Sequence, residues 1–313
     1  MLCYPLVLIN YSALQYVNFV SFKTTISLLV LALFSIPANS EQTLVCDEDA
    51  SCIAENSWQI GIAIGLGGRT NPLVDGDTIP LLIVPDIAYY AESAYFDNGE
   101  LGWQLLPSPT TSIEFFVAPN FEQANFSFWH TANLLAPSSL NENSPDPGAD
   151  GSELPTGEQP DWISVDDIAS RDWAFDAGFR WQWYSDNHHF SVSVAHDASK
   201  VYEDAHASIK YQYLTQLKGW HIRISPFLKW YSDGLTDYYY GISERDTQSG
   251  EFIYTASGGL QYGLSLYAAY KINANWHGLV RANLTQLHSG MTDSPLVEDN
   301  SIYTAFAGFA YRF

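Results

Sequence analysis

Long segments of the chain alternate between apolar and polar residues, and this pattern constrains the fold more than any other feature. In AHASIKYQYL, Ala207, Ile209, Tyr211 and Tyr213 alternate with polar neighbours such as Lys210. A period of two indicates a β-strand with one apolar face. After residue 40, no stretch approaches the roughly 18 apolar residues of a membrane helix. A mature chain that entered a membrane would therefore cross it with strands.

The strand-like segments follow one another along most of the chain, and they predict an all-β fold. We expect an antiparallel transmembrane β-barrel of twelve strands, with ten as the alternative. The segments run about 10 to 18 residues, longer than usual strands and suited to tilted membrane crossings. They cover residues 58–68, 79–91, 94–106, 111–123, 172–185, 188–198, 204–214, 219–231, 236–243, 254–271, 275–288 and 302–313.

Three short turns expose a conflict within this assignment. SDNHH (185–189), TQLKG (215–219) and INAN (272–275) have the length of periplasmic turns. The twelve predicted segments do not place all three at the same end of a barrel. At least one segment must therefore be wrongly assigned.

Alternation alone does not say which face points inward, because a soluble sandwich shows the same pattern as a barrel. Trp220 and Trp230 lie at the two ends of one apolar face, where an interfacial aromatic girdle belongs. The last strand runs to the final residue, as expected if it closes a barrel wall. Its Phe309, Tyr311 and Phe313 also resemble the C-terminal signal read by the barrel-assembly machinery.

The first 57 residues are predicted to lie outside the barrel. Lys23, the apolar run 26–36 and small residues before Ser40 predict a signal peptide over residues 1–40. Residues 41–57 form an acidic segment that we expect to be flexible. It contains Cys46 and Cys52, for which a disulfide is expected outside the cytosol. The barrel then occupies residues 58–313.

A long acidic loop interrupts the strand series at about residues 124–171. Its central part, residues 137–170, is rich in proline and acids and has no lysine or arginine. A solvated surface loop is the favoured interpretation. A lid, a partner-binding arm and a divalent-ion site are the alternatives.

The net charge of the chain limits the classes of partner that it can bind. The formal net charge of −22 argues against nucleic acid, because phosphate binding needs a basic surface. If the segments form a barrel, the polar faces of the strands line its lumen, and several bases would face inward. They are Arg180, Lys210, Arg223, Lys229 and Arg281, together with His206, His221 and His277. Such a lumen would favour anions. Alternatively, ion pairs with acids such as Glu114 and Asp176 fill it.

No catalytic grouping, metal site or cofactor site is predicted, so an enzyme is not expected. The pair His288-Ser289 is adjacent on a predicted strand, where neighbours point to opposite faces. The pairs His188-His189 and His196-Asp197 are excluded for the same reason. No His/Cys cluster has metal-ligand spacing. GLGG (65–68) lacks a following helix, which favours strand glycines over a phosphate loop.

Specific stretches resemble a known family. DYYYGIS (237–243) and MTDSPLVED (291–299) are similar to motifs of the MipA/OmpV family of outer-membrane proteins, as is the closing AGFAYRF. WQIGIAIGLGG (58–68) and IPLLIVPDIAYY (79–90) follow the order of that family. The resemblance covers residues 58–313. Its motif residues here are Tyr238, Tyr239, Tyr240, Gly241, Asp293, Ser294 and Pro295.

The resemblance implies an outer-membrane β-barrel that contacts outer-membrane lipid. It also implies a scaffold role, in which a periplasmic lytic transglycosylase and a murein synthase are the partners. It supplies no catalytic residues. A small-solute outer-membrane channel is the alternative function, and a lipid-modifying barrel enzyme is a further one.

Overall fold

The computed structural model describes residues 56–126, 162–247 and 252–313. The predicted signal peptide, the Cys46–Cys52 disulfide and most of the predicted acidic segment lie outside these residues. The same is true of residues 127–161, the larger part of the predicted acidic loop.

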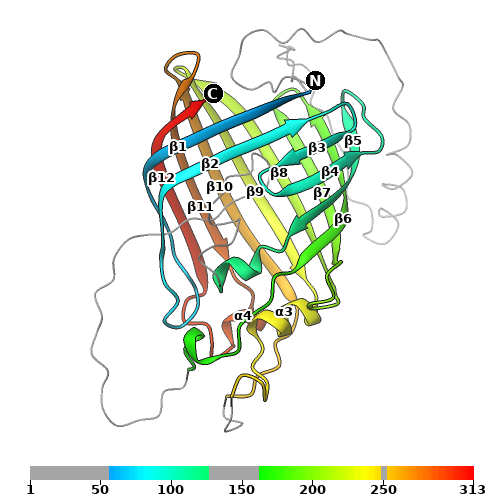
Figure 1. Cartoon of the computed structure of the whole chain (residues 1–313), viewed down its shortest axis with the longest axis vertical. Helices are drawn as coiled ribbons and strands as arrows, with labels where there is room; N and C mark the ends of the chain where they lie inside the picture. The colour runs from blue at the N-terminus through cyan, green and yellow to red at the C-terminus, as the bar shows by residue number, and fades with distance from the viewer. Residues whose placement is uncertain (1–55, 127–161, 248–251) are drawn as a thin grey trace, which may run out of the picture.

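Twelve antiparallel strands form one closed barrel (Figure 1), which confirms the predicted fold class. Each strand pairs with its neighbours in chain order, and β1 pairs with β12 to close the wall. The strands are β1 (Ser57–Arg69), β2 (Ile79–Tyr90), β3 (Ala94–Asp97), β4 (Glu100–Gln104), β5 (Thr111–Pro119), β6 (Phe175–Ser185), β7 (His188–Asp197), β8 (Ala205–Leu217), β9 (Trp220–Tyr231), β10 (Gly259–Lys271), β11 (Trp276–Gln286) and β12 (Ser301–Arg312).

The predicted strand count is correct only because two errors cancel. The predicted segment 236–243 lies mainly in helix α3 (Asp233–Tyr240), not in a strand. The predicted segment 94–106 is a hairpin of the two short strands β3 and β4, with the turn at Asn98 and Gly99. With both corrections, the three short turns fall at the same end of the barrel, together with Ser57 and Phe313.

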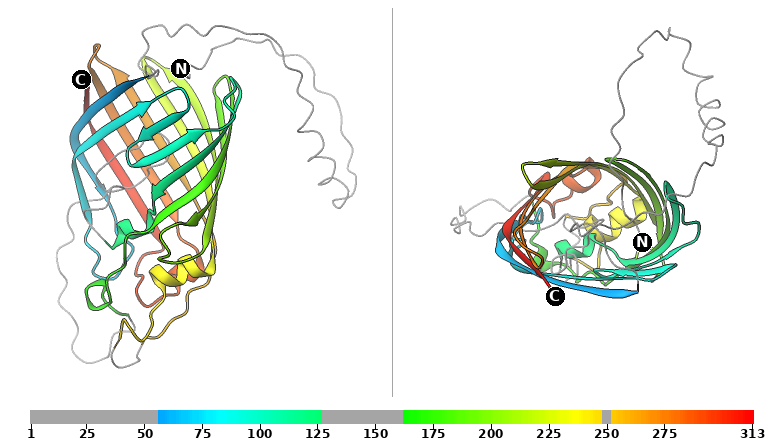
Figure 2. Two further views of the ribbon diagram at one scale, coloured as in Figure 1. Left: turned by 45° about the vertical axis from the view of Figure 1, so that its right-hand side comes forward. Right: turned by 90° about the horizontal axis from the view of Figure 1, so that it is seen from above.

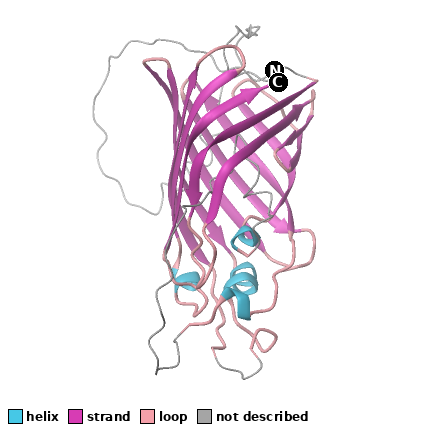
Figure 3. Ribbon diagram, turned by 60° about the vertical axis from the view of Figure 1, so that its left-hand side comes forward, coloured by secondary structure: helices cyan, strands magenta, loops and turns pink. Residues whose placement is uncertain are grey.

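We call this end the terminal rim and the opposite end, where the longer connections lie, the loop rim (Figure 2). All described helical segments lie towards the loop rim (Figure 3). They are η1 (Glu122–Asn125), η2 (Val165–Asp167), α3 and α4 (Ser289–Thr292). None of the described helices is long and apolar enough to cross a membrane.

The strands alternate between an apolar outer face and a more polar inner face. On β6, Phe179 is 58% exposed, whereas the neighbouring Arg180 is 5% exposed. On β10, Leu264 is half exposed, and the adjacent Ser265 bonds to Asn283 within the wall. An outer face of large exposed apolar residues is the pattern of a barrel surrounded by lipid.

The last strand is joined to the first along its length. The backbone N–H of Phe313 donates to the carbonyl of Ile60, so even the last residue belongs to the wall. Phe306 points inward and lies against Gly65 and Gly67, where any Cβ would come within 2.8 Å of its ring. The GLGG stretch therefore belongs to β1, as predicted, and its glycines make room for Phe306.

Candidate functional site

Charged residues are segregated around the lumen of the barrel. Strands β8 to β12 contain no aspartate or glutamate within their bounds. All the acids of the twelve strands lie on β2 to β7. They are Asp86, Asp97, Glu100, Glu114, Asp176 and Asp197. One arc of the wall is therefore acidic, and the arc facing it is basic.

Arg180 lies within the acidic arc and is paired there. Its guanidinium donates to both carboxylate oxygens of Glu100, at 2.7 and 2.8 Å, and lies 3.5 Å from Glu114. It also stacks over the ring of Phe116, 4.4 Å from the centroid. The Tyr95 hydroxyl joins the group through Glu100. Ion pairing of this kind is the alternative that the sequence left open for the lumen.

Asp176 forms a second polar cluster on the same arc. His206 Nε2 lies 2.9 Å from its carboxylate, and the Tyr202 hydroxyl and the Asn120 amide both donate to it. Asp176 is 3% exposed, so these partners compensate for its burial. The two acids that the sequence suggested as neutralising groups, Glu114 and Asp176, are both engaged with bases.

The basic arc brings together two of the predicted bases. Arg223 on β9 and Arg281 on β11 are each directly opposite Tyr267 on β10 in the strand register. The Arg223 guanidinium lies 5.4 Å from the centre of the Tyr267 ring. The Lys229 ammonium lies 5.4 Å from the ring of Phe227 on its own strand. The structure places Lys210 on β8, at the edge of this arc beside β7, and Arg180 on β6, away from it.

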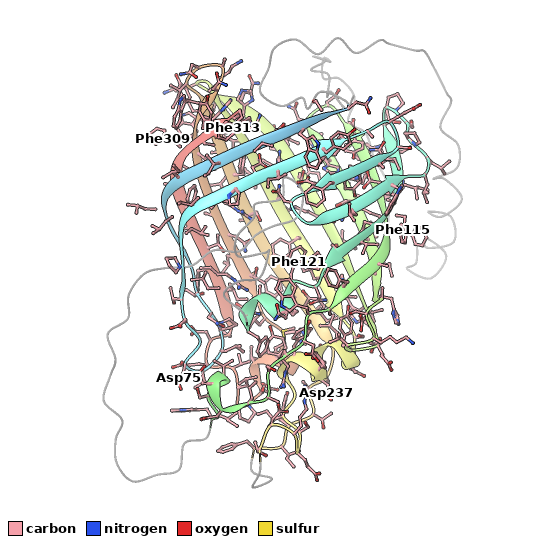
Figure 4. All side chains as sticks on the ribbon, viewed as in Figure 1. Asp75, Phe115, Phe121, Asp237, Phe309 and Phe313 are labelled. Atoms are coloured by element: carbon pink, nitrogen blue, oxygen red, sulfur yellow. The ribbon has the colours of Figure 1, made fainter. Side chains whose placement is uncertain are left out.

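A compact apolar core lies at the loop rim and is built mainly from connections between strands. We call it the loop-rim core (Figure 4). Its fully buried members include Leu235, Tyr239 and Tyr240 of α3 and Met291 of α4. Leu296 completes the set from the connection that precedes β12.

The two family motifs meet in the loop-rim core. The Ser294 hydroxyl donates to the Tyr240 carbonyl at 2.6 Å, and the Ile163 N–H donates to the Pro295 carbonyl. Gly241 follows α3, where an added Cβ would clash with Asp237 at 2.3 Å. The Tyr238 hydroxyl accepts a hydrogen bond from the backbone N–H of Asp172, and Asp293 ends α4. The motif residues thus join loops, and they form no catalytic grouping.

Glu122 is buried where η1 enters the barrel. It accepts hydrogen bonds from the hydroxyls of Tyr231 and Tyr240. Burial and the nearby Glu122 carboxylate raise the pKa of Tyr240 well above its usual value, which keeps its hydroxyl protonated as a donor. Arg69 donates to Asn125 at the end of η1, so the same short helix is tied to β1.

Arg171 fixes the end of the predicted acidic loop. Its guanidinium is fully buried, lies 2.7 Å from Asp246 and donates to the carbonyl of Gly241 at 3.0 Å. Burial raises the pKa of Asp246, but hydrogen bonds from Arg171 and the Ser243 backbone outweigh it, and the net pKa is lowered. Asp246 therefore stays ionised and keeps its partner.

Sequence reasoning missed Glu100, Glu122, Arg171 and Asp246. One signal was available for Arg171, because no lysine or arginine occurs between Arg69 and Arg171. A single base after so long an interval suggests a buried partner. The excluded pair His288-Ser289 also needs a correction. Its two residues lie at the start of α4, so strand geometry does not apply to them. No group of metal-ligating side chains occurs among the described residues.

Comparison with known proteins identifies the family. The family model described as "MltA-interacting protein MipA" matches residues 60–313. Outer membrane protein Omp26La of Vibrio anguillarum is 30% identical over 94 residues, which cover 29% of this chain and 37% of the relative. The MltA-interacting protein of Escherichia coli K12 is 30% identical over 87 residues, covering 28% and 35%. The chain thus spans little more than a third of the length of the curated relatives it matches.

Two solved structures are similar to this chain at low sequence identity. A Pseudomonas aeruginosa FadL homologue has 10% identity and a TM-score of 0.33, covering 82% of this chain and 86% of its own. OprD from the same species has 11% identity and a TM-score of 0.35, covering 80% and 66%. With a closed twelve-strand wall, an apolar outer face and a family match over residues 60–313, the chain belongs to the MipA family of outer-membrane β-barrel proteins.

Proposed function

We propose that the protein is a non-enzymatic scaffold that holds a periplasmic lytic transglycosylase, and through it a murein synthase, against the outer membrane. The family match over residues 60–313 carries this proposal, because the family and one relative are named for interaction with MltA. The polar clusters add support. A serine nucleophile would need a histidine bonded to its hydroxyl. Within the described ranges, five histidine side chains instead bond to residues other than serine: His188, His189, His196, His206 and His221.

The terminal rim is the surface that such a partner would use. Short turns of outer-membrane barrels face the periplasm, and longer loops face outward. The terminal rim carries the short turns around Asp186, Lys218 and Asn273, and exposed Leu105 and Leu106 precede β5. The acidic segment 41–57, most of which lies outside the described residues, would emerge on the same side.

A matched pair of lysines tests the proposal. Lys218 at the terminal rim and Lys200 at the loop rim are both exposed and both have positive φ, at 51° and 63°. The purified barrel would be immobilised in detergent and titrated with the purified lytic transglycosylase of the same organism. We expect saturable binding that weakens at least tenfold in Lys218→Glu and stays unchanged in Lys200→Glu. Absence of saturable binding, or loss in Lys200→Glu alone, would contradict the proposal.

The segregated charges favour a second candidate function, an anion-preferring channel. An anion in the lumen would be attracted to the arc that carries Arg223, Lys229 and Arg281 and repelled by the acids opposite. Planar-bilayer recordings test this function. Stable conductance steps whose selectivity moves towards cations in Arg223→Glu and Arg281→Glu, but not in Lys218→Glu, would support it. Silent bilayers from protein shown to be folded by heat-modifiable mobility would count against it.

A further inference from the structure

The hydrogen-bonded wall is interrupted between β2 and β5. β3 pairs with β2 only at Ala88–Tyr90, and β4 pairs with β5 only over residues 101–104 and 114–117. Within the described part of the chain, residues 79–86 of β2 have no strand on the side away from β1. This unpaired stretch is about 26 Å long at roughly 3.3 Å per residue. Figure 1 shows the β3–β4 hairpin spanning only the part of the wall near the terminal rim.

Two residues near the β2 edge, Asn98 and Pro85, suit a strand whose pairing ends at this point. The Ile87 N–H donates to the Asn98 side chain, and the Asn98 N–H donates to the Ile87 carbonyl, both at 2.9 Å. These bonds cap the ladder at the hairpin turn. Two residues further, the backbone of Pro85 is directed to the same side, and proline has no N–H to leave unpaired. An unpaired edge in lipid is costly, and Pro85 lowers that cost.

The interruption lies at the depth of the lipid-facing belt. On the outer surface beside it, Leu66 is 76% exposed, Leu82 is 53% exposed and Ile83 is 58% exposed. It occupies the half of the wall nearer the loop rim, which faces the outer leaflet when the short turns face the periplasm. In that orientation, lipid chains of the outer leaflet would lie beside this edge.

On the lumen side, a small apolar cluster lies on each side of the interruption. Ala63, Leu81, Val84 and Phe306 form one buried apolar cluster on the β1, β2 and β12 side. A second cluster, on the β5 and β7 side, consists of Phe116, Ala118 and Ala195. The lumen wall elsewhere carries the ion pairs of β4 to β6 and the bases of β8 to β11. Phe116 lies opposite Gly102 within the β4–β5 ladder and carries the Arg180 guanidinium on its ring, so Ala118 is the member of the second cluster beyond that ladder. The cluster on the β2 side gives the interruption an apolar lining that fits an apolar occupant.

We propose that the interruption between β2 and β5, here called the seam, is a lateral portal. It admits the acyl chain of an outer-leaflet lipid between the two strands towards the apolar clusters inside. Separating any other neighbouring strands would leave several backbone groups unpaired in lipid, each costing several kcal/mol. Among the described residues, separating β2 from β5 at the seam breaks no strand ladder. Phe121, half-buried and just beyond the end of β5, lies beside the seam (Figure 4).

Photolabelling of the intact barrel tests the portal. The protein would be reconstituted with a phospholipid that carries a diazirine on one acyl chain, irradiated and mapped by mass spectrometry. Outward Phe115 and Leu264 report ordinary lipid contact. Inward Ser265 and Asn283, in the fully paired wall, report the background. We expect labelling of Val84, Phe116 and Phe121 to reach within about threefold of the outward residues, whereas Ser265 and Asn283 stay unlabelled.

Two inward alanines supply matched variants. Ala118 lies at the seam and Ala269 lies on β10, which is paired along both edges. We expect Ala118→Glu to lower labelling of Phe116 and Val84 at least threefold, and Ala269→Glu to leave it unchanged. Inward labelling at the background level of Ser265 in the native protein would overturn the portal. If a variant fails to fold, the native labelling pattern decides alone.

Discussion

At the residue scale, Arg171 shows how a buried charge holds the loop-rim core together. Its partner Asp246 is also approached by Arg245, whose side chain is 47% exposed and whose Nε lies 3.8 Å away. One carboxylate thus has a buried base and an exposed base. Replacing Arg171 leaves the buried Asp246 carboxylate without its buried partner, whereas replacing Arg245 removes only an exposed base. The two substitutions therefore permit a controlled comparison.

Arg171→Met is expected to destabilise the loop-rim core by about 3 kcal/mol, and Arg245→Met by less than about 0.5 kcal/mol. Hydrogen exchange at the amides of Gly241, Ile242 and Ser243 measures the local free energy of opening. The barrel should keep its heat-modifiable mobility in both variants. Equal effects of the two variants would show that burial of Arg171 is not what matters.

His288 is expected to make the loop-rim core sensitive to pH. Burial lowers the pKa of His288, while Glu122 raises it by a smaller amount, so the folded state favours the neutral ring. The unfolded loop therefore binds the proton first. Stability is full above a pH of about 6.5 and is lost as the pH falls through the folded pKa. We expect the protection factor of the Met291 amide, which bonds to the His288 carbonyl, to fall between pH 7.5 and 5.

A His288→Asn variant is the control for this pH dependence. It removes the titrating ring, so protection of Met291 should become flat between pH 7.5 and 5, whatever its absolute level. The Asp246 ion pair is lost only below about pH 4, because its pKa is lowered. If the pH dependence of Met291 protection persists in His288→Asn, another titrating group causes it.

At the element scale, sequence predicted most strands and missed two elements for local reasons. Asn98-Gly99 is the turn pair that two-residue hairpins prefer, and both residues have positive φ, at 48° and 102°. Recognising it would have divided segment 94–106. Ser232 caps α3 by accepting from the Leu235 N–H, which is a helix-start signal ahead of the three tyrosines. The aromatic composition of α3 favoured a strand and outweighed that signal.

Glycines in the wall differ in how closely the neighbouring strand approaches. A Cβ on Gly65 would lie 2.3 Å from the Ala307 carbonyl oxygen, whereas a Cβ on Gly278 has nothing nearer than 3.9 Å. We expect Gly65→Ala to destabilise the barrel by about 1–3 kcal/mol, and Gly278→Ala to change it by less than about 0.5 kcal/mol. Urea unfolding followed by mobility on gels measures both, and similar midpoints would contradict the steric account.

At the scale of the whole molecule, alternation together with strand length, the aromatic ends of the apolar faces and the C-terminal strand predicted the barrel, while the contacts inside it depend on register. The inward bases could be read from single strands. The pairing of Arg180 with Glu100 could not be predicted from the sequence, because the two residues are far apart in it and meet only after β4, β5 and β6 align. The loop-rim core was hidden for the same reason, since its members come from several separate connections.

The C-terminal residue, Phe313, allows assembly into the outer membrane and stability of the folded barrel to be tested separately. Phe313 is 79% exposed: its backbone makes a hydrogen bond that any residue can make, and its ring packs edge-on against Tyr311 on the outer face, 5.0 Å between centroids. We expect Phe313→Ser to lower the amount of barrel in the outer membrane of cells several-fold. Refolded in detergent, the same variant should unfold within about 0.5 kcal/mol of the native protein. An equal loss of stability in detergent would make Phe313 a structural residue and not an assembly signal.

The short β3–β4 hairpin also gives the barrel unequal mechanical properties along its axis. In the part of the chain that the structure describes, a cross-section near the terminal rim cuts twelve strands joined in an unbroken hoop. A cross-section near the loop rim cuts ten, and the joint between β2 and β5 has no ladder there. A continuous hoop resists becoming oval, because every deformation stretches hydrogen bonds. A hoop with one such joint bends there first. Lateral tension near the loop rim is therefore expected to be taken up between β2 and β5, while the terminal rim keeps its shape.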